Sequence, residues 1–258
     1  MPSATDASAR PLPAARPMIE VESLTIGYGE RVVLERLDFT IASGQVFAIL
    51  GGSGCGKSTL LRHLIGLETP MAGTIRIAGA PPVQDTGAPA YGVLFQSGAL
   101  FGSMTLAENV SLPLRTWTTL DTHAIDTIVR AKLRLVGLEG FENHAPSELS
   151  GGMKKRAGIA RALALDPPLL FLDEPSAGLD PVSSFELDQL LLTLNHSLGM
   201  TTVIVTHELQ SIFAVADQCI MLDRGARGII ARGHPATLRD SSEDPRVHAF
   251  FNRESQPS

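Results

Sequence analysis

Residues 51–58 read Gly51-Gly52-Ser53-Gly54-Cys55-Gly56-Lys57-Ser58. Their spacing, G-x-x-x-x-G-K-[ST], is typical of a loop that binds nucleotide phosphates. Phosphates need several backbone N–H donors in a small nest, and glycine lets the backbone bend that closely. In this pattern the lysine binds the β- and γ-phosphates, and the final hydroxyl binds Mg²⁺. The predicted nucleotide contacts are Gly51, Gly52, Ser53, Gly54, Cys55, Gly56, Lys57, Ser58 and Thr59.

The segments on either side of the loop support this prediction. Residues 45–50 form an apolar run that reads as a buried strand entering the loop. Residues 58–67 read as a helix leaving the loop, with an apolar stripe at Leu60, Leu61, Leu64 and Ile65. The helix N-terminus points a partial positive charge at the phosphates. Strand, loop and helix in this order separate the motif from a glycine-rich turn without a ligand.

The segment before the loop predicts a small antiparallel layer. Residues 1–17 are rich in Ala, Pro and Ser and are expected to be disordered. Three short strands follow, near residues 19–26, 32–34 and 37–41. Tyr28 stands between two glycines, where its ring could stack on an adenine; the alternative is an ordinary surface tyrosine.

Polar residues follow three later apolar strands. Residues 91–95 end at Gln96, residues 168–172 end at Asp173 and Glu174, and residues 201–206 end at His207. In an α/β sheet the carboxyl ends of the strands border the ligand crevice. We expect Gln96 to reach Mg²⁺ or the attacking water, and Asp173 to hold Mg²⁺.

The last two acids of the second strand are expected to have separate tasks, because strand alternation sends their side chains to opposite sides. Glu174 is the candidate that polarises the attacking water, and His207 is the candidate donor to a γ-phosphate. The alternative for each is a structural role. The two acids would then only solvate the end of a strand, and His207 would only form a hydrogen bond within the fold.

A second anion site is predicted within residues 97–165, which read as mostly helical. Ser150 is placed as the N-cap of a helix that begins with Gly151 and Gly152. Two glycines at a helix start cost about 2 kcal/mol in propensity. They also leave the first N–H groups bare, which suits an anion. An ordinary helix start is the alternative.

Size and composition exclude several classes of protein. The chain has 258 residues, enough for one large domain or a domain with a subdomain. Its longest apolar runs are about five residues, whereas a membrane span needs about 20. No apolar stretch marks a signal peptide, so cytoplasmic residence is expected, and Cys55 and Cys219 are expected to stay unpaired. A net charge of −6 argues against a nucleic-acid partner.

Together these motifs, in this order, resemble the ATP-binding subunits of ABC transporters over about residues 18–240. Two further stretches complete the resemblance: Leu149-Ser150-Gly151-Gly152 and Ser176-Ala177-Gly178-Leu179-Asp180. The chain departs from the family pattern at Met153, where glutamine is usual, and methionine lacks glutamine's hydrogen bonds. The resemblance implies an α/β P-loop fold with a mostly parallel sheet, an N-terminal antiparallel layer and a helical subdomain.

The resemblance also implies how such a chain works. Two copies sandwich two ATP molecules head to tail, with Mg²⁺. Each ATP lies between the phosphate loop of one copy and Ser150, Gly151, Gly152 and Asp180 of the other. Hydrolysis then drives a transmembrane permease. The alternatives are an ABC ATPase for another cargo, or a soluble one in assembly work such as iron–sulfur cluster biogenesis. DNA-repair relatives carry long coiled coils, and no sustained heptad occurs here.

Within the ABC family, three stretches look like the ATPases of Mce/Mla-type (toluene-tolerance type) phospholipid transporters: residues 95–101, 149–156 and 244–253. This resemblance implies lipid transport between bacterial membranes. The protein would lie peripherally on the cytoplasmic face of the inner membrane. Its partners would be permease subunits, an Mce-type lipid-binding protein and a STAS-domain accessory protein. In the tail, residues 241–258, Val247, Phe250 and Phe251 share one helical face, which is expected to pack on a neighbouring subunit.

Overall fold

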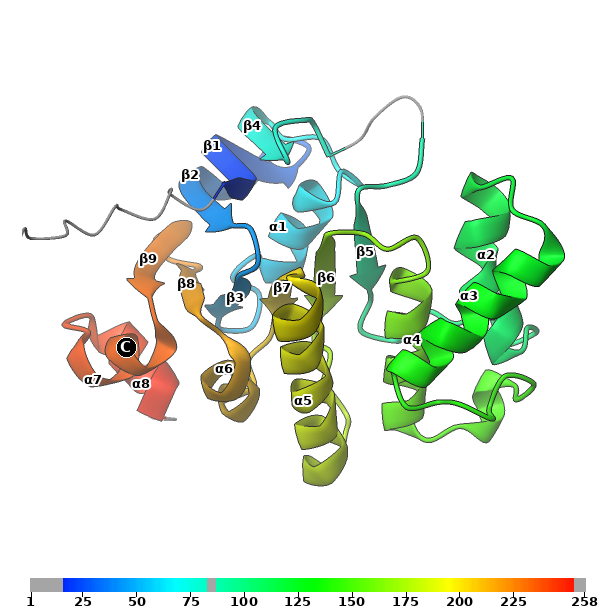
Figure 1. Ribbon diagram of the computed structural model, residues 1–258. Coiled ribbons are helices and arrows are strands. Elements are labelled where there is room, and N and C mark those ends of the chain that lie inside the picture. The colour runs from blue at the N-terminus through cyan, green and yellow to red at the C-terminus, as the bar shows by residue number, and fades with distance from the viewer. Residues whose placement is uncertain (1–15, 83–86, 253–258) are drawn as a thin grey trace, which may run out of the picture.

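The protein is described here from a computed structural model that covers residues 16–82 and 87–252 (Figure 1). Its strands are β1 (Pro17–Tyr28), β2 (Arg31–Ala42), β3 (Val46–Gly51), β4 (Ala72–Ile77), β5 (Tyr91–Leu94), β6 (Leu169–Asp173), β7 (Thr201–Val205), β8 (Gln218–Asp223) and β9 (Gly228–Gly233). Within the described residues, the larger sheet has the order β5-β6-β7-β3-β8-β9, with its first five strands parallel. The smaller sheet is antiparallel, in the order β2-β1-β4. The α/β prediction with an N-terminal antiparallel layer is confirmed.

The helices pack around the larger sheet, and two groups of them lie at opposite ends of the molecule (Figure 1). They are α1 (Lys57–Leu64), α2 (Leu106–Trp117), α3 (Thr122–Leu135), α4 (Gly151–Ala162), α5 (Pro181–Leu198), α6 (Leu209–Val215), α7 (Pro235–Ser241) and α8 (Pro245–Asn252), with a 3₁₀ turn at Pro146–Glu148. Figure 1 shows α2, α3 and α4 gathered beyond β5, at the opposite end of the molecule from α7 and α8. The predicted helical subdomain is this first group, although its helices begin only at Leu106.

The parallel register brings the predicted site segments to one edge of the larger sheet. Val205 at the end of β7 pairs with both Ile49 of β3 and Asp173 of β6, and Leu94 of β5 pairs with Leu172. The chain therefore leaves β3, β5, β6 and β7 at the same edge. That edge is where ligands bind in sheets of this kind.

The smaller sheet corrects two predictions. The strands expected at residues 32–34 and 37–41 are one strand, β2, because a bulge absorbs the residues between them. Its partner β1 pairs Leu24 with Leu37 but Ile26 with Leu34, so β2 carries one extra residue there. The sequence also predicts disorder for residues 1–17, but Pro17 is ordered and pairs with Ala42 in the sheet. The prediction for residues 1–15 lies outside the described residues.

Helix α1 ends three residues earlier than expected, at Leu64 rather than Leu67. Gly66 takes a φ of +67°, which a helix cannot continue through. The Leu67 N–H then bonds back to the Arg62 carbonyl at 2.8 Å, closing the helix end.

The tail corrects a further prediction. Val247 and Phe251 of α8 are buried within this chain, packed with residues of β3, α6 and β8. They are therefore not available to pack on a neighbouring subunit as expected. Phe250, the third member of the predicted face, is only partly buried. The sequence showed an apolar helix face but gave no sign that its own sheet edge would cover it.

Two findings bear on the composition. Among residues 16–82 and 87–252, no helix combines the length and apolar character that a membrane span requires. Cys55 and Cys219 are both free and buried, as expected.

Candidate functional site

The phosphate loop joins β3 to α1 at the edge described above, and its first glycine is required by close packing. Gly51 has a φ of +146°, and a Cβ there would lie 2.4 Å from the Leu222 carbonyl oxygen of β8. Cys55 is buried beneath the loop, and this burial raises the pKa of its thiol. Of the predicted loop contacts, Cys55 can therefore offer a ligand only its backbone.

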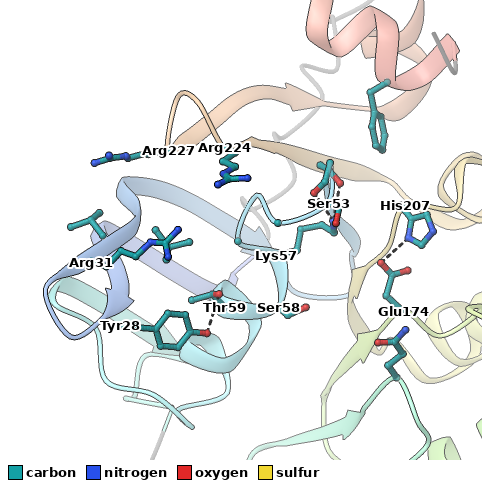
Figure 2. A pocket seen from close by; sticks show the side chains of 18 of the residues that line it. Tyr28, Arg31, Ser53, Lys57, Ser58, Thr59, Glu174, His207, Arg224 and Arg227 are labelled. Carbon is teal, nitrogen blue, oxygen red and sulfur yellow. Dashed lines mark hydrogen bonds and ion pairs between the residues drawn. The ribbon is translucent and has the colours of Figure 1, made fainter. Parts of the chain in front are cut away.

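The polar side chains of the loop lie along one wall of the site (Figure 2). The Lys57 ammonium donates to the carbonyl oxygens of Gly51 at 2.8 Å and Gly52 at 3.1 Å, which holds it across the loop. The Tyr28 hydroxyl and the Thr59 hydroxyl lie 3.1 Å apart. This bond fixes the half-exposed Tyr28 ring beside the first turn of α1.

A single pocket of about 1090 Å³ gathers most of the predicted residues. Its lining includes Tyr28, Gly51, Gly52, Ser53, Gly54, Gly56, Lys57, Ser58, Thr59, Gln96, Glu174 and His207. These residues are up to 179 positions apart in sequence, from Tyr28 to His207, and the common sheet edge unites them. A nucleotide's base, ribose and phosphates all fit within a pocket of this size.

Glu174 and His207 form a pair on the opposite wall from Lys57 (Figure 2). The His207 Nδ1 lies 2.8 Å from the Glu174 Oε1. Strand β6 ends at Asp173, and Glu174 takes a φ of +46°, held by its N–H donating to the Val205 carbonyl at 2.8 Å. Glu174 lies one residue beyond the strand, so the predicted alternation does not apply to it: a backbone turn, not the strand pleat, directs Glu174 into the pocket.

Asp173 is electrostatically unusual. Burial and the charge of Glu174 raise the pKa of the Asp173 carboxyl. Within the described residues, Asp173 Oδ1 and Glu174 Oε2 are buried without a hydrogen-bond partner. Buried carboxylate oxygens of this kind suit a divalent cation, and Mg²⁺ prefers oxygen ligands and bound water. Ser58 and Gln96 line the pocket and Asp173 does not, but the unpaired Asp173 oxygen fits the chemistry of the predicted magnesium site.

The second predicted anion site lies elsewhere on the molecule. Ser150 caps α4, its Oγ accepting the Met153 N–H at 3.2 Å, as predicted. Asp180 caps α5, its Oδ1 accepting the Val182 and Ser183 N–H groups, each at 3.0 Å. Ser150, Gly151, Gly152 and Asp180 do not line the pocket described above. The pocket of a single chain therefore contains the phosphate loop without these four residues.

The pocket also contains residues that sequence reasoning missed. They are Glu30, Arg31, Val32, Val33, Arg224, Arg227 and Phe250. Arg224 and Arg227 lie in the turn between β8 and β9, and β8 is paired with β3 as far as Gly51 and Leu222. A predicted β3–β8 pairing could have placed these arginines beside the phosphate loop. Nothing in the sequence brings Phe250, in the C-terminal helix, to the same place.

The fold and this site define a P-loop protein that binds nucleotide. Comparison with known proteins then gives the family: the ABC transporter family matches residues 34–177, more than half of the chain. The chain belongs to the ABC transporter family, whose cassettes are ATPases. It is 31% identical to the dimeric ATP-binding cassette MJ0796, solved in a post-hydrolysis state with ADP and phosphate. The match has a TM-score of 0.74 and covers 84% of this chain and 98% of that one.

Two relatives named for transport are similar over most of this chain. The probable ribonucleotide transport ATP-binding protein mkl of Mycobacterium tuberculosis is 43% identical over 91% of this chain. The chain spans 66% of that relative, just under two thirds of its length. The intermembrane phospholipid transport system ATP-binding protein MlaF of Haemophilus influenzae is 39% identical over 92% of this chain and 91% of MlaF.

Proposed function

We propose that two copies of this chain form a head-to-tail ATPase that drives a membrane transporter. The observation that carries the proposal is the separation of the two anion sites. One chain contains a pocket with a phosphate loop, whereas its Ser150 helix start lies outside that pocket. In a two-fold dimer, the helix start of each copy can complete the pocket of the other.

The wall formed by the phosphate loop binds ATP. Backbone N–H groups of residues 51–58 cradle the phosphates, Lys57 neutralises the β- and γ-phosphates, and Tyr28 stacks on the adenine. Ser58, Gln96 and Asp173 would hold Mg²⁺, directly or through water. When bound, Mg²⁺ neutralises charge that develops on the phosphate oxygens.

The opposite wall carries out the chemistry. Glu174 accepts a proton from the attacking water, because its carboxylate projects into the pocket and its Oε2 is free of hydrogen bonds from the described residues. His207 keeps that carboxylate oriented by donating its Nδ1–H to Glu174 Oε1. With Nε2 also protonated, the ring donates to the γ-phosphate. Gln96 positions the water from the end of β5.

Replacing the proposed base tests these roles. Glu174→Gln keeps the size of the side chain but removes the group that accepts the proton. We expect ATP to bind normally and kcat to fall by about 10²–10⁴-fold. Glu186→Gln, on the surface of α5, is the control and should retain its turnover. Near-normal turnover of purified Glu174→Gln would exclude Glu174 as the base.

For the cargo, we propose phospholipids or related lipids moved between bacterial membranes. The likeness to MlaF over nearly the whole of both chains supports this choice, as do the three lipid-transporter stretches in the sequence. The protein would lie on the cytoplasmic face of the inner membrane beneath two permease subunits. An Mce-type lipid-binding protein and a STAS-domain protein would complete the complex. Exposed Phe101, in the segment 97–104 beside the site, offers an apolar contact for the permease.

Ribonucleotide transport is a second candidate, because mkl has the higher identity and is named for it. A deletion strain separates the two cargoes. Loss of a lipid transporter should disturb outer-membrane lipid asymmetry and raise detergent sensitivity, and a Lys57→Ala copy should not restore either. Normal barrier function, with a different permease purified alongside the protein, would overturn the lipid cargo but not the ATPase. If the protein is instead a soluble assembly ATPase, no transmembrane partner should purify with it.

A further inference from the structure

Two cations on helix α4 are bound to backbone carbonyls rather than to acids. The Lys155 ammonium donates to the Gln96 carbonyl oxygen at 2.6 Å and to the Glu174 carbonyl oxygen at 3.1 Å. Arg161 donates to the carbonyl oxygens of Ala99 at 2.7 Å and Gly98 at 3.3 Å. Across the described residues, neither side chain has a carboxylate oxygen within 4.0 Å. Both cations are thus used to hold the main chain.

Lys155 is also deeply buried, with 6% of its surface exposed. Burial lowers the pKa of its ammonium, while the carboxylates of Asp173 and Glu174 act in the opposite direction. A buried charge is costly unless strong hydrogen bonds compensate it. The position of Lys155 is therefore fixed by the two carbonyls and the nearby acids together, and it cannot move away without losing that compensation.

Helix α4 also packs closely against the end of β5 and the segment after it. Gly158 lies one turn beyond Lys155, and a Cβ there would lie 2.5 Å from Leu94 Cδ1 and 3.2 Å from the Gly98 carbonyl oxygen. Lys155, Gly158 and Arg161 recur every three residues, so they share one face of the helix. This face binds residues 94–99 over its whole length.

The second carbonyl that Lys155 binds, that of Glu174, belongs to a strained part of the backbone. Glu174 has a φ of +46°, a conformation that costs a non-glycine residue about 1–3 kcal/mol unless its surroundings impose it. Its carbonyl accepts from Lys155 and from the Ala177 N–H at 3.2 Å. Since this turn directs the Glu174 carboxylate into the pocket, its supports bear on the chemistry.

We propose that Lys155 is a positioning residue that ties Gln96 and Glu174 to helix α4. Movement of the segment 97–104 would then shift the base in this chain's pocket together with the Ser150 helix start. In the proposed dimer that helix start faces the other copy's nucleotide. The proposal rests on the role proposed above for Glu174, and it identifies one side chain through which a partner on residues 97–104 can control hydrolysis.

Lys155→Met tests this proposal, because methionine is similar in length and removes only the charge and the donors. We expect kcat to fall by about tenfold to hundredfold, with KM for ATP within about threefold of the parent value. Lys132→Met is the matched control: it removes another buried lysine of the helical subdomain, one that pairs with Asp166. It should lower the melting temperature without changing kcat.

The outcomes distinguish the possible failures. If Lys155→Met lowers the melting temperature as Lys132→Met does but keeps kcat within about twofold, its role is structural and the proposal is overturned. If Lys155→Met does not fold, Lys155→Leu, which also lacks a donor, takes its place, and full kcat in that variant overturns the proposal equally. Glu174→Gln is measured in the same assay. If Glu174→Gln is inactive but the Lys155 variant is fully active, only the role proposed for Lys155 is rejected. If Glu174→Gln turns over ATP normally, the role of Glu174 itself is rejected.

Discussion

Asp188 on α5 gives a prediction whose size can be worked out from the structure. Asp188 is 6% exposed, and burial raises the pKa of its carboxyl from 3.8 to about 6, against the opposing effect of a hydrogen bond with Ser211 of α6. The folded state therefore favours the protonated acid. In the unfolded chain the acid ionises at the lower pH, so stability is lost as the pH rises from about 4 through 6.

The penalty follows from the two pKa values. One pH unit corresponds to about 1.4 kcal/mol, so ionising Asp188 costs the fold about 3 kcal/mol at pH 8. The same relation gives about half of that penalty at pH 5 and less than about 1 kcal/mol at pH 4. Asp188→Asn removes the penalty, and its amide can still bond to Ser211. We therefore expect the variant to be more stable by these amounts.

The assay is urea unfolding followed by circular dichroism, for the parent chain and the variant at pH 8, 6, 5 and 4. Asp126→Asn, at an exposed position on α3, is the control and should change stability little at any pH. A gain that does not vary with pH, or a loss of stability at pH 8, would refute the reasoning. The first result would mean that Asp188 stays charged in the fold at no cost.

Two further predictions concern the nucleotide and the tail. Lys57→Ala should weaken ATP binding by removing the cation that faces the phosphates; unchanged affinity and turnover in calorimetric and ATPase measurements would count against that role. Phe251→Ala should lower the free energy of unfolding by about 3–5 kcal/mol, because the ring is buried against this chain's own core. A loss below about 1 kcal/mol in urea unfolding would place the ring at an exposed surface instead.

The sequence was sufficient to predict the strands that end at the site. The glycines and the lysine of the phosphate loop identify it as a nucleotide-binding motif. Apolar runs that end in Gln96, Asp173 and His207 predict a shared sheet edge, because parallel strands place their carboxyl ends together. The structure brings Gln96, Glu174 and His207 into one pocket with the loop.

What the sequence did not reveal depends on contacts between distant segments. The positive φ of Glu174 is imposed by Val205 and Lys155, which lie on other elements, so no local pattern marks it. Lys155 itself reads as one charge among several on a basic helix. Val247 and Phe251 form a clear apolar face, but the pattern cannot say whether this chain or a second copy covers it.

The mixed dimer tests the central claim most directly. Ser150→Arg should block the site of the other copy, and Lys57→Ala should disable its own pocket, so each variant alone should be inactive. In an equal mixture, half of the dimers carry both variants, and each of these contains one intact composite site.

The measurement is the ATPase rate of that mixture compared with the parent chain. With independent sites, the head-to-tail arrangement predicts recovery of roughly one quarter of the parent activity. A mixture that stays inactive, with no crosslink between residue 150 of one copy and the phosphate loop of the other, would contradict the composite site.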